Sequence, residues 1–237
     1  QKLAPRNAKN TLNSSNIWKG IERPAIVTPI PNEKGGHTFL IDSGASANAK
    51  AKNLLQNALL GYNYAKRVRH IAEPKVGLLN IGAESTKGST EATEAYELLS
   101  KQTWFPFAGN CEGRDIPTGK FDVVVTDGFT GNVVLKFGEG LGRLFVTMIK
   151  DAANRGGITA KLGALLLKPA LKKYMMKKLN YEEEGGAPLL GINGTLIISH
   201  GASRRRAIRN AVRLASQVAE ERIPDIVRET LQEELKD

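Results

Sequence analysis

The chain has 237 residues, of which 41% are hydrophobic and 24% charged, a composition typical of globular proteins that excludes a disordered or fibrous class. Lys and Arg number 34 against 24 Asp and Glu, giving a formal net charge of +10, which favours an anionic partner without identifying it. The single cysteine, Cys111, excludes an internal disulfide, and no apolar run reaches the roughly 18 residues of a membrane-spanning helix, so we expect a cytoplasmic protein.

Residues 1–16 are polar and rich in Asn and Lys, and we interpret them as an arm outside the fold. Residues 17–237 are predicted to form one α/β domain. Within it, a short apolar run, a Gly-rich turn and an amphipathic helix follow one another four times. The apolar runs are residues 39–41, 76–81, 121–126 and 196–199, and the helices after them cover residues 54–62, 89–99, 132 onward and 204–222.

This alternation predicts an open, doubly wound α/β fold, in which a mainly parallel sheet carries helices on both faces. The uninterrupted apolar run at residues 123–125 agrees with a strand buried on both sides. Ligands of such sheets bind outside the carboxyl ends of the strands. We therefore expect the four Gly-rich turns to gather at one edge and to hold the functional site.

Residues 156–186 depart from this rhythm and carry a dense mixture of leucine, methionine and lysine. Pro169 lacks an amide donor, so we expect it to start or kink a helix. We predict that this insert forms a helical hairpin projecting from the sheet. After Pro224, a charged amphipathic helix is expected to close the chain.

The turn at residues 127–132 combines two glycines with the start of a helix. Glycine lets the backbone approach a ligand closely, and the first amides of a helix attract anions. We therefore predict a phosphate site formed by Asp127, Gly128, Thr130 and Gly131. An ordinary turn between a strand and a helix explains the same residues equally well.

The turn at residues 82–89 has the ingredients of a second phosphate loop, in which Gly82 and Gly88 flank Lys87. It is not a Walker A sequence, because the lysine precedes the glycine. Lys87 can still act as a point charge on a phosphate, although a lone lysine also fits a solvated surface.

Other reactive side chains give weaker signals. Cys111 has no histidine near it in the sequence, so an inert packed thiol is favoured over a nucleophile. The three histidines are too dispersed to predict a metal site. Asp42 and His200 follow the first and fourth apolar runs, and both remain site candidates. The motifs G-x-S-x-G and G-x-G-x-x-G are absent, which counts against a serine hydrolase and a dinucleotide enzyme.

Several blocks of the sequence, taken together and in order, resemble one family. The blocks are residues 75–82 with 86–88, 109–110 with 112–117, 127–133, 162–169, 185–191 and 200–201. They resemble the phosphate acyltransferases of bacterial phospholipid synthesis, the PlsX family, from about residue 20 to residue 208. The resemblance is specific because several blocks match together and in order, and it does not depend on one short motif.

The resemblance implies transfer of a long fatty acyl chain from acyl carrier protein to inorganic phosphate. It also implies a homodimer, no metal or organic cofactor, and a fold like those of phosphotransacetylases and isocitrate dehydrogenases. By their positions in the matched blocks, Lys87 and Asn132 correspond to residues implicated in the family's activity. Phosphate held at the two turns would attack the thioester directly, and Asn132 or a nearby amide would stabilise the oxyanion.

The resemblance further implies peripheral contact of the insert with membranes. The insert has six lysines between Lys161 and Lys178, which suit an anionic membrane or the acidic carrier protein. The predicted carrier-protein or membrane surface consists of Lys161, Leu165, Leu166, Lys168, Leu171, Lys172, Lys173, Arg206 and Arg209. A dimer-forming hairpin and a merely solvated arginine face stay open as alternatives.

The family normally begins with a strand and two glycine turns that have no counterpart here, so we expect the domain to be incomplete on its amino-terminal side. Alternatives are therefore a truncated, non-catalytic relative that only binds a partner, a short-chain acyl-coenzyme A:phosphate transferase, and a basic nucleic-acid-binding protein. The insert favours the long-chain activity. The scarcity of aromatic residues near the basic stretches argues against a nucleic acid partner.

Overall fold

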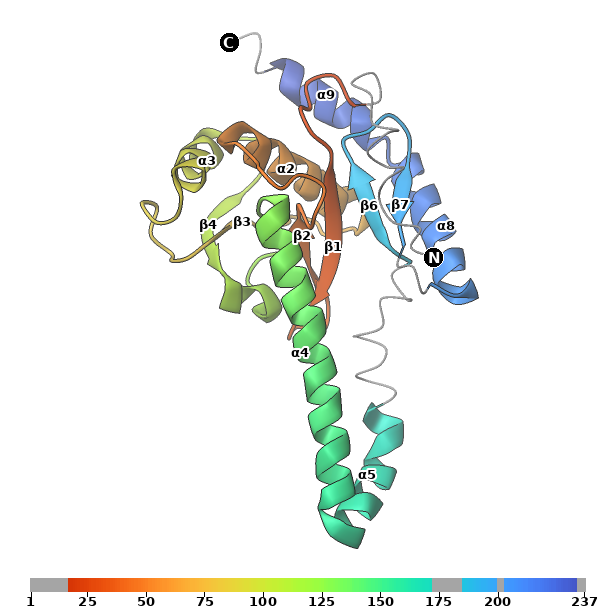
Figure 1. The fold of residues 1–237 in the computed structure, drawn as a ribbon. Helices are drawn as coiled ribbons and strands as arrows, with labels where there is room; N and C mark the ends of the chain where they lie inside the picture. Colours follow the sequence, from red (N-terminus) through yellow and green to blue (C-terminus); the bar gives the residue numbers. More distant parts are fainter. Residues whose placement is uncertain (1–16, 172–184, 200–202, 234–237) are drawn as a thin grey trace.

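A computed structural model describes residues 17–171, 185–199 and 203–233 (Figure 1). Its seven strands form one sheet in the order β4-β3-β5-β2-β1-β6-β7. The strands are β1 (Ala25–Pro31), β2 (His37–Ile41), β3 (Val76–Asn80), β4 (Phe107–Glu112), β5 (Val123–Val125), β6 (Ala187–Leu190) and β7 (Leu196–Ile198). The helical elements are α2 (Ala51–Asn63), η2 (Tyr64–Val68), α3 (Thr90–Lys101), η3 (Gly113–Thr118), α4 (Gly128–Arg155), α5 (Gly157–Leu171), α8 (Arg205–Glu220) and α9 (Ile223–Glu233).

The strand directions confirm the predicted α/β class. Strands β4, β3, β5 and β2 are parallel to one another, whereas β1 is antiparallel to both of its neighbours, β2 and β6. Strand β6 therefore points the same way as β2, so that five of the seven strands share one direction. The sheet is mainly parallel, with helices on both faces.

Strand β7 does not join this parallel set, because it is antiparallel to β6. Its last residue, Ile198, pairs with Ala187 at the start of β6, so β7 ends at the edge where the parallel strands begin. The expectation that all four apolar runs end at one edge is therefore wrong for the run that forms β7. Strand direction depends on the pairing partner, which the apolar pattern does not specify. His200 lies outside the described residues.

The core lies on the two faces of the sheet. Val123 and Val125 of β5 face a large cluster that includes α2, whereas Val124 faces a smaller cluster with Ile116 of η3 and Val134 of α4. Of the 13 residues of α2, 12 are buried, which is the mark of a helix covered on nearly every side. Gly61 permits this close packing, because a Cβ atom there would lie 2.7 Å from Val123 Cγ1.

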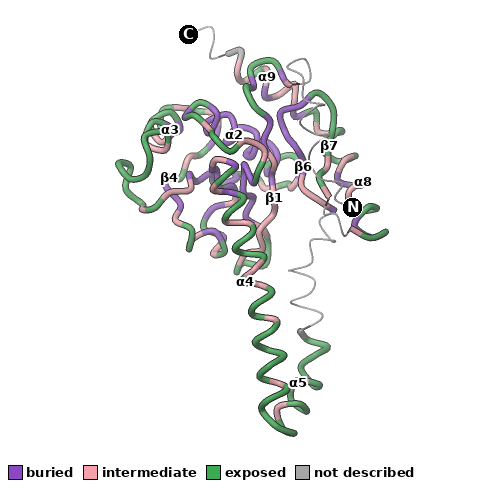
Figure 2. The backbone as a smooth tube through the Cα atoms, in the orientation of Figure 1, coloured by how far each residue is buried: buried purple, intermediate pink, exposed green. Residues whose placement is uncertain are grey.

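The projecting hairpin begins earlier than predicted. Helix α4 has 28 residues, of which only Gly128 and Gly131 are buried, and it leaves the sheet after its first turns. Helix α5 packs back against it (Figure 1), and the outer parts of both helices are mostly exposed (Figure 2). We call this pair the α4–α5 hairpin. Its first arm is α4, not the segment after residue 156, and residues 172–184 of the predicted insert lie outside the described residues.

No helix in the described part of the chain is both long and apolar enough to cross a membrane.

Strands β1, β4 and β6 were not expected from the sequence. Strand β1 contains Pro29 and Pro31, which argue against a strand in the interior of a sheet. It nevertheless pairs with β2 from Val27 to Pro31, with Pro29 opposite Phe39.

Candidate active site

Three segments that contain predicted site residues directly follow three neighbouring strands. In the order β3-β5-β2, the loop at residues 81–88 follows β3, the start of α4 follows β5, and the loop at residues 42–46 follows β2. All three strands are parallel, so their carboxyl ends share one edge of the sheet. Lys87, the first turn of α4 and Asp42 thus come to the edge where α/β proteins bind ligands.

Asp42 organises the loop after β2. Its side chain is 1% exposed, and its Oδ1 accepts hydrogen bonds from the amides of Ile26, Gly44 and Ala45 at 3.1, 3.0 and 2.8 Å. Its Oδ2 accepts one from the Ser46 amide at 2.7 Å. Burial raises the pKa of the Asp42 carboxyl, and the four amide donors only partly oppose that rise. Asp42 therefore shapes the loop and has little surface left for a substrate.

The first turn of α4 packs tightly against that loop. The Gly128 amide donates to the Ser46 carbonyl at 2.8 Å, and a Cβ atom at Gly131 would lie 2.0 Å from the Asp42 carbonyl oxygen. Both glycines are thus needed for contact between backbone segments. This packing explains them without any ligand.

Asp127 caps α4. Its Oδ1 accepts a hydrogen bond from the Thr130 amide at 2.8 Å and its Oδ2 accepts one from the Thr130 hydroxyl at 2.7 Å. A carboxylate at this position already satisfies a free helix amide and complements the helix dipole. The first three amides of α4 belong to Gly128, Phe129 and Thr130. Within the described part of the chain, only the Phe129 amide among them has no acceptor. An anion at this turn would therefore need a positive charge from elsewhere.

Lys87 lies in the loop after β3, with an exposed side chain. Its amide donates to the Glu84 carbonyl at 3.2 Å, which closes a tight turn. Its side-chain stem passes over Gly82, where a Cβ atom would lie 3.2 Å from Lys87 Cγ. The ammonium is thus carried on an ordered loop at the carboxyl edge of the sheet.

Asn132 is exposed in the second turn of α4. Its side chain lies beside Gly44, because a Cβ atom at Gly44 would be 3.7 Å from Asn132 Oδ1. The amide group therefore stands between the loop after β2 and the solvent at the same edge as Lys87. An exposed amide here can donate to a ligand oxygen.

The comparisons with known proteins identify the family. A family model described as "Fatty acid synthesis protein" matches residues 8–225. The chain is 54% identical over 198 residues to the phosphate acyltransferase of Heliobacterium modesticaldum, a match that covers 84% of this chain and 58% of that protein. The chain belongs to the phosphate acyltransferase family. It is also 50% identical over 197 residues to the phosphate acyltransferase of Aquifex aeolicus, covering 83% of this chain and 57% of that relative.

The chain spans about three fifths of the length of the curated relatives that it matches. Among solved structures it resembles a phosphotransacetylase from Streptococcus pyogenes, with a TM-score of 0.57 and 18% identity over 91% of this chain and 60% of that one. A branched-chain phosphotransacylase from Enterococcus faecalis V583 gives a TM-score of 0.56 and 13% identity over 92% of this chain and 70% of that one. Likenesses at these identities show the fold alone, which agrees with the predicted phosphotransacetylase-like fold.

Cys111 does not suit the chemistry of a nucleophile. Its side chain is completely buried, and burial raises the pKa of its thiol to about 12. A thiol with such a pKa is protonated at neutral pH and is a poor nucleophile. Among the described residues, no three His, Cys, Asp or Glu side chains gather in a way that could hold a metal ion.

The predicted carrier-protein or membrane residues lie on two separate elements. Lys161, Leu165, Leu166 and Lys168 are exposed on α5, whereas Arg206 and Arg209 are exposed on α8. Lys172 and Lys173 lie outside the described residues, as does the side chain of Leu171. The middle of α8 lies beside Gly185, just before β6 begins, where a Cβ atom would be 2.4 Å from the Ala211 amide. The arginines of α8 are therefore at the edge opposite the Lys87 loop.

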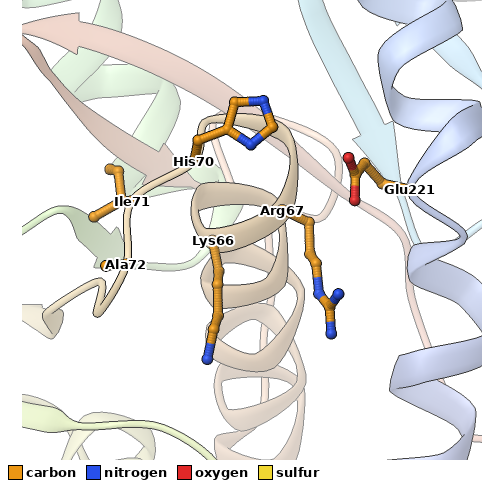
Figure 3. Close-up of a pocket in the computed structure, with 6 residues that line it drawn as sticks. All are labelled: Lys66, Arg67, His70, Ile71, Ala72 and Glu221. Atoms are coloured by element: carbon orange, nitrogen blue, oxygen red, sulfur yellow. The ribbon is translucent and has the colours of Figure 1, made fainter.

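A hollow of about 450 Å³ that no sequence motif predicted is lined by Lys66, Arg67, His70, Ile71, Ala72 and Glu221 (Figure 3). Ile71 and Ala72 shortly precede β3, so the hollow lies where the parallel strands begin. Its lining mixes three basic side chains with one carboxylate. It is thus remote from the edge that carries Lys87 and Asn132.

Proposed function

We propose that this chain transfers a long-chain fatty acyl group from acyl carrier protein to inorganic phosphate, giving an acyl phosphate for phospholipid synthesis. The observation that carries the proposal is the 54% identity to a phosphate acyltransferase over 84% of the chain. The neighbouring strand ends that carry Lys87 and the α4 turn with Asn132 support it further. Two groups that can bind phosphate oxygens stand at the ligand edge of the fold.

In the proposed reaction, a phosphate oxygen attacks the carbonyl carbon of the thioester. The carbon–sulfur bond then breaks, and the carrier thiol leaves with the proton that the attacking phosphate releases. Lys87 would bind and orient the phosphate as a point charge. Because Asp127 already caps α4, we assign the positive charge at the site to Lys87 and not to the helix amides alone.

Asn132 is proposed to donate its side-chain N–H to the oxyanion that forms on the carbonyl carbon. Loss of one such donor typically lowers turnover by about 10² to 10³. No covalent acyl-enzyme is needed, in keeping with the buried, high-pKa thiol of Cys111. The proposed phosphate contacts also include the backbone around Gly82 and Gly88.

We propose two roles for the α4–α5 hairpin. Exposed apolar residues follow one face of α4, and a second copy of the chain would cover them in a homodimer; they are Phe129, Val133, Phe137, Leu141, Leu144, Phe145 and Met148. Exposed leucines on α5 lie among lysines, which suits peripheral contact with an anionic membrane. Acyl carrier protein would approach the same membrane-facing side or the arginines of α8.

The test is acyl phosphate formation by the purified chain from palmitoyl acyl carrier protein and inorganic phosphate. Lys87→Ala and Asn132→Ala should each lower turnover by about 10² or more. Lys101→Ala is the matched control, because Lys101 is an exposed lysine on α3 whose closest carboxylate is 3.9 Å away. Palmitoyl-coenzyme A and acetyl-coenzyme A serve as alternative donors. A folded parent without turnover would favour a partner-binding relative, and a preference for acetyl-coenzyme A would favour a short-chain enzyme.

A further inference from the structure

Two asparagines from neighbouring strands hold the loop that carries Lys87. Asn80 is the last residue of β3, and its Nδ2 donates to the Lys87 carbonyl at 2.8 Å. Its Oδ1 accepts from the Ile81 amide at 2.8 Å. One side chain therefore ties the first residue of the loop to its seventh.

Asn110 holds the middle of the same loop from β4. Its Nδ2 donates to the Glu84 carbonyl at 2.7 Å. The same carbonyl accepts the Lys87 amide, so the turn that presents Lys87 is anchored to the neighbouring strand. The Lys87 backbone is thus fixed through its amide and through its carbonyl, by side chains from two strands.

The glycine after Lys87 completes this arrangement. Gly88 has a φ of +103°, and a Cβ atom there would lie 2.4 Å from Asn80 Oδ1. Asn80 can approach the loop only because residue 88 has no side chain. The loop and the asparagine are therefore matched in shape.

The buried side chain of Asn110 lowers the stability of the fold. The residue is 5% exposed, and its Oδ1 is buried without a hydrogen-bond partner among the described residues. Burying an unsatisfied acceptor is unfavourable, and an apolar side chain of similar shape would avoid that penalty. The donation from Nδ2 to the loop is the interaction that an apolar residue could not provide.

We infer that Asn80 and Asn110 are positioning residues for Lys87, which hold its loop so that the ammonium meets the phosphate. The inference rests on the proposed function, because it takes the phosphate role of Lys87 from there. A lysine has a long, flexible side chain, so its placement depends on a fixed backbone. Loss of either asparagine should weaken phosphate binding without removing the charge itself.

The experiment measures the dissociation constant of inorganic phosphate by calorimetry at fixed ionic strength. Asn80→Ala removes the donor to Lys87 without adding a charge near the phosphate, and Asn110→Leu removes both the donor and the unsatisfied oxygen. Each should raise the constant about tenfold, as expected for loss of one well-placed hydrogen bond. Asn32→Ala is the control, because Asn32 makes similar bonds, to Thr38 and Gly36, in the β1–β2 turn.

The decisive comparison repeats the substitutions in a Lys87→Ala background. If the asparagines act through Lys87, they should change the already weakened affinity by less than about twofold there, since effects of coupled residues do not add. The inference would be overturned if each asparagine substitution weakened phosphate binding equally with Lys87 present and with Lys87→Ala. It would also be overturned if the substitutions left the affinity of the protein with Lys87 unchanged, or if the parent bound no phosphate. Asn110→Leu should also melt no lower than the parent, which separates positioning from a folding role.

Turnover is measured separately on the same proteins. A parent that binds phosphate through Lys87 but forms no acyl phosphate would refute the proposed function. The inference would then be upheld by the non-additive affinities or overturned by additive ones. The two failures are therefore distinguishable.

Discussion

Gly128 and Asp42 are in such close contact that a Cβ atom at residue 128 would lie 2.7 Å from the Asp42 carboxylate oxygen Oδ2. The contact joins the start of α4 to the end of β2. It fixes Asn132, one turn further along α4, relative to the loop after β2. Close packing of the Gly128 backbone against the buried Asp42 carboxylate thus positions one of the two proposed catalytic side chains.

Gly131→Ala should test this packing most severely, because its Cβ atom would lie 2.0 Å from the Asp42 carbonyl oxygen. Overpacking of this kind lowers the free energy of unfolding by about 1 to 3 kcal/mol or more. The control is Gly138→Ala in the same helix, where nothing lies within 4 Å of the added atom and stability should rise by roughly 0.5 to 1 kcal/mol. Urea denaturation of both variants makes the comparison, and equal stabilities would contradict this packing.

The carboxylate of Asp127 should matter for stability through its cap on α4. Asp127→Ala removes the acceptor for the Thr130 amide and should lower the free energy of unfolding by about 1 kcal/mol. Asp127→Asn keeps a capping oxygen and should recover most of that loss. Thermal melting provides the measurement. A variant with alanine as stable as the parent would mean that the cap contributes nothing.

The sequence predicted that the turns with Lys87 and Asn132 share one edge of the sheet, but not the order of the strands that carry them. Lys87 and Asn132 lie at one edge because parallel strands end together, which the alternation of strands and helices already implied. That β5 lies between β3 and β2 depends on long-range pairing and has no local sequence signal. The expected direction of the fourth apolar run was wrong for the same reason, since β7 pairs antiparallel with β6.

The supporting contacts were also beyond sequence reasoning. Asn110 and Glu84 are 26 residues apart, and their hydrogen bond joins a side chain to a backbone carbonyl. The identities of the two residues therefore do not predict the contact. Gly128 and Gly131 were predicted to contact a phosphate, and in the structure both also accommodate the loop that Asp42 organises. Glycine marks a close approach, and sequence alone does not reveal what approaches.

The raised pKa of Asp42 gives a prediction for stability against pH. A carboxyl whose folded pKa exceeds its unfolded pKa contributes stability below the unfolded value, and that contribution is lost as pH rises through the folded value. Asp42→Asn cannot titrate and resembles the protonated acid. It should match the parent most closely below about pH 4, the usual pKa of aspartate, where the carboxyl is protonated in both the folded and the unfolded parent, and gain on it as pH rises.

Urea denaturation of the parent and Asp42→Asn between acid and neutral pH would measure this difference. The control is Asp122→Asn, because Asp122 accepts a hydrogen bond from the Lys75 amide at 2.8 Å at an exposed position. A parent that gained stability over Asp42→Asn with rising pH would show that the four amide donors outweigh burial.

The buried thiol of Cys111 should not react with thiol reagents in the folded protein. It is 0% exposed, and its pKa is raised to about 12, so the thiolate that such reagents need is nearly absent at pH 8. Labelling should appear only when denaturant unfolds the chain, and Cys111→Ala should retain turnover despite some loss of stability. Rapid labelling of the folded chain, or loss of turnover on labelling, would restore the nucleophile hypothesis.

The two proposed roles of the α4–α5 hairpin separate by substitution, because they use different helices. Phe137 on α4 is 69% exposed and Leu166 on α5 is 75% exposed, so a charge at either position should leave the melting temperature of the monomer unchanged. Phe137→Asp should abolish the dimer in light scattering, whereas Leu166→Glu should weaken sedimentation with phosphatidylglycerol vesicles by roughly tenfold, since a buried leucine contributes about 1.5 to 3 kcal/mol. Leu98→Glu on α3, also an exposed leucine, should change neither. If Phe137→Asp released the protein from vesicles but kept it dimeric, the membrane and not a second copy would cover α4.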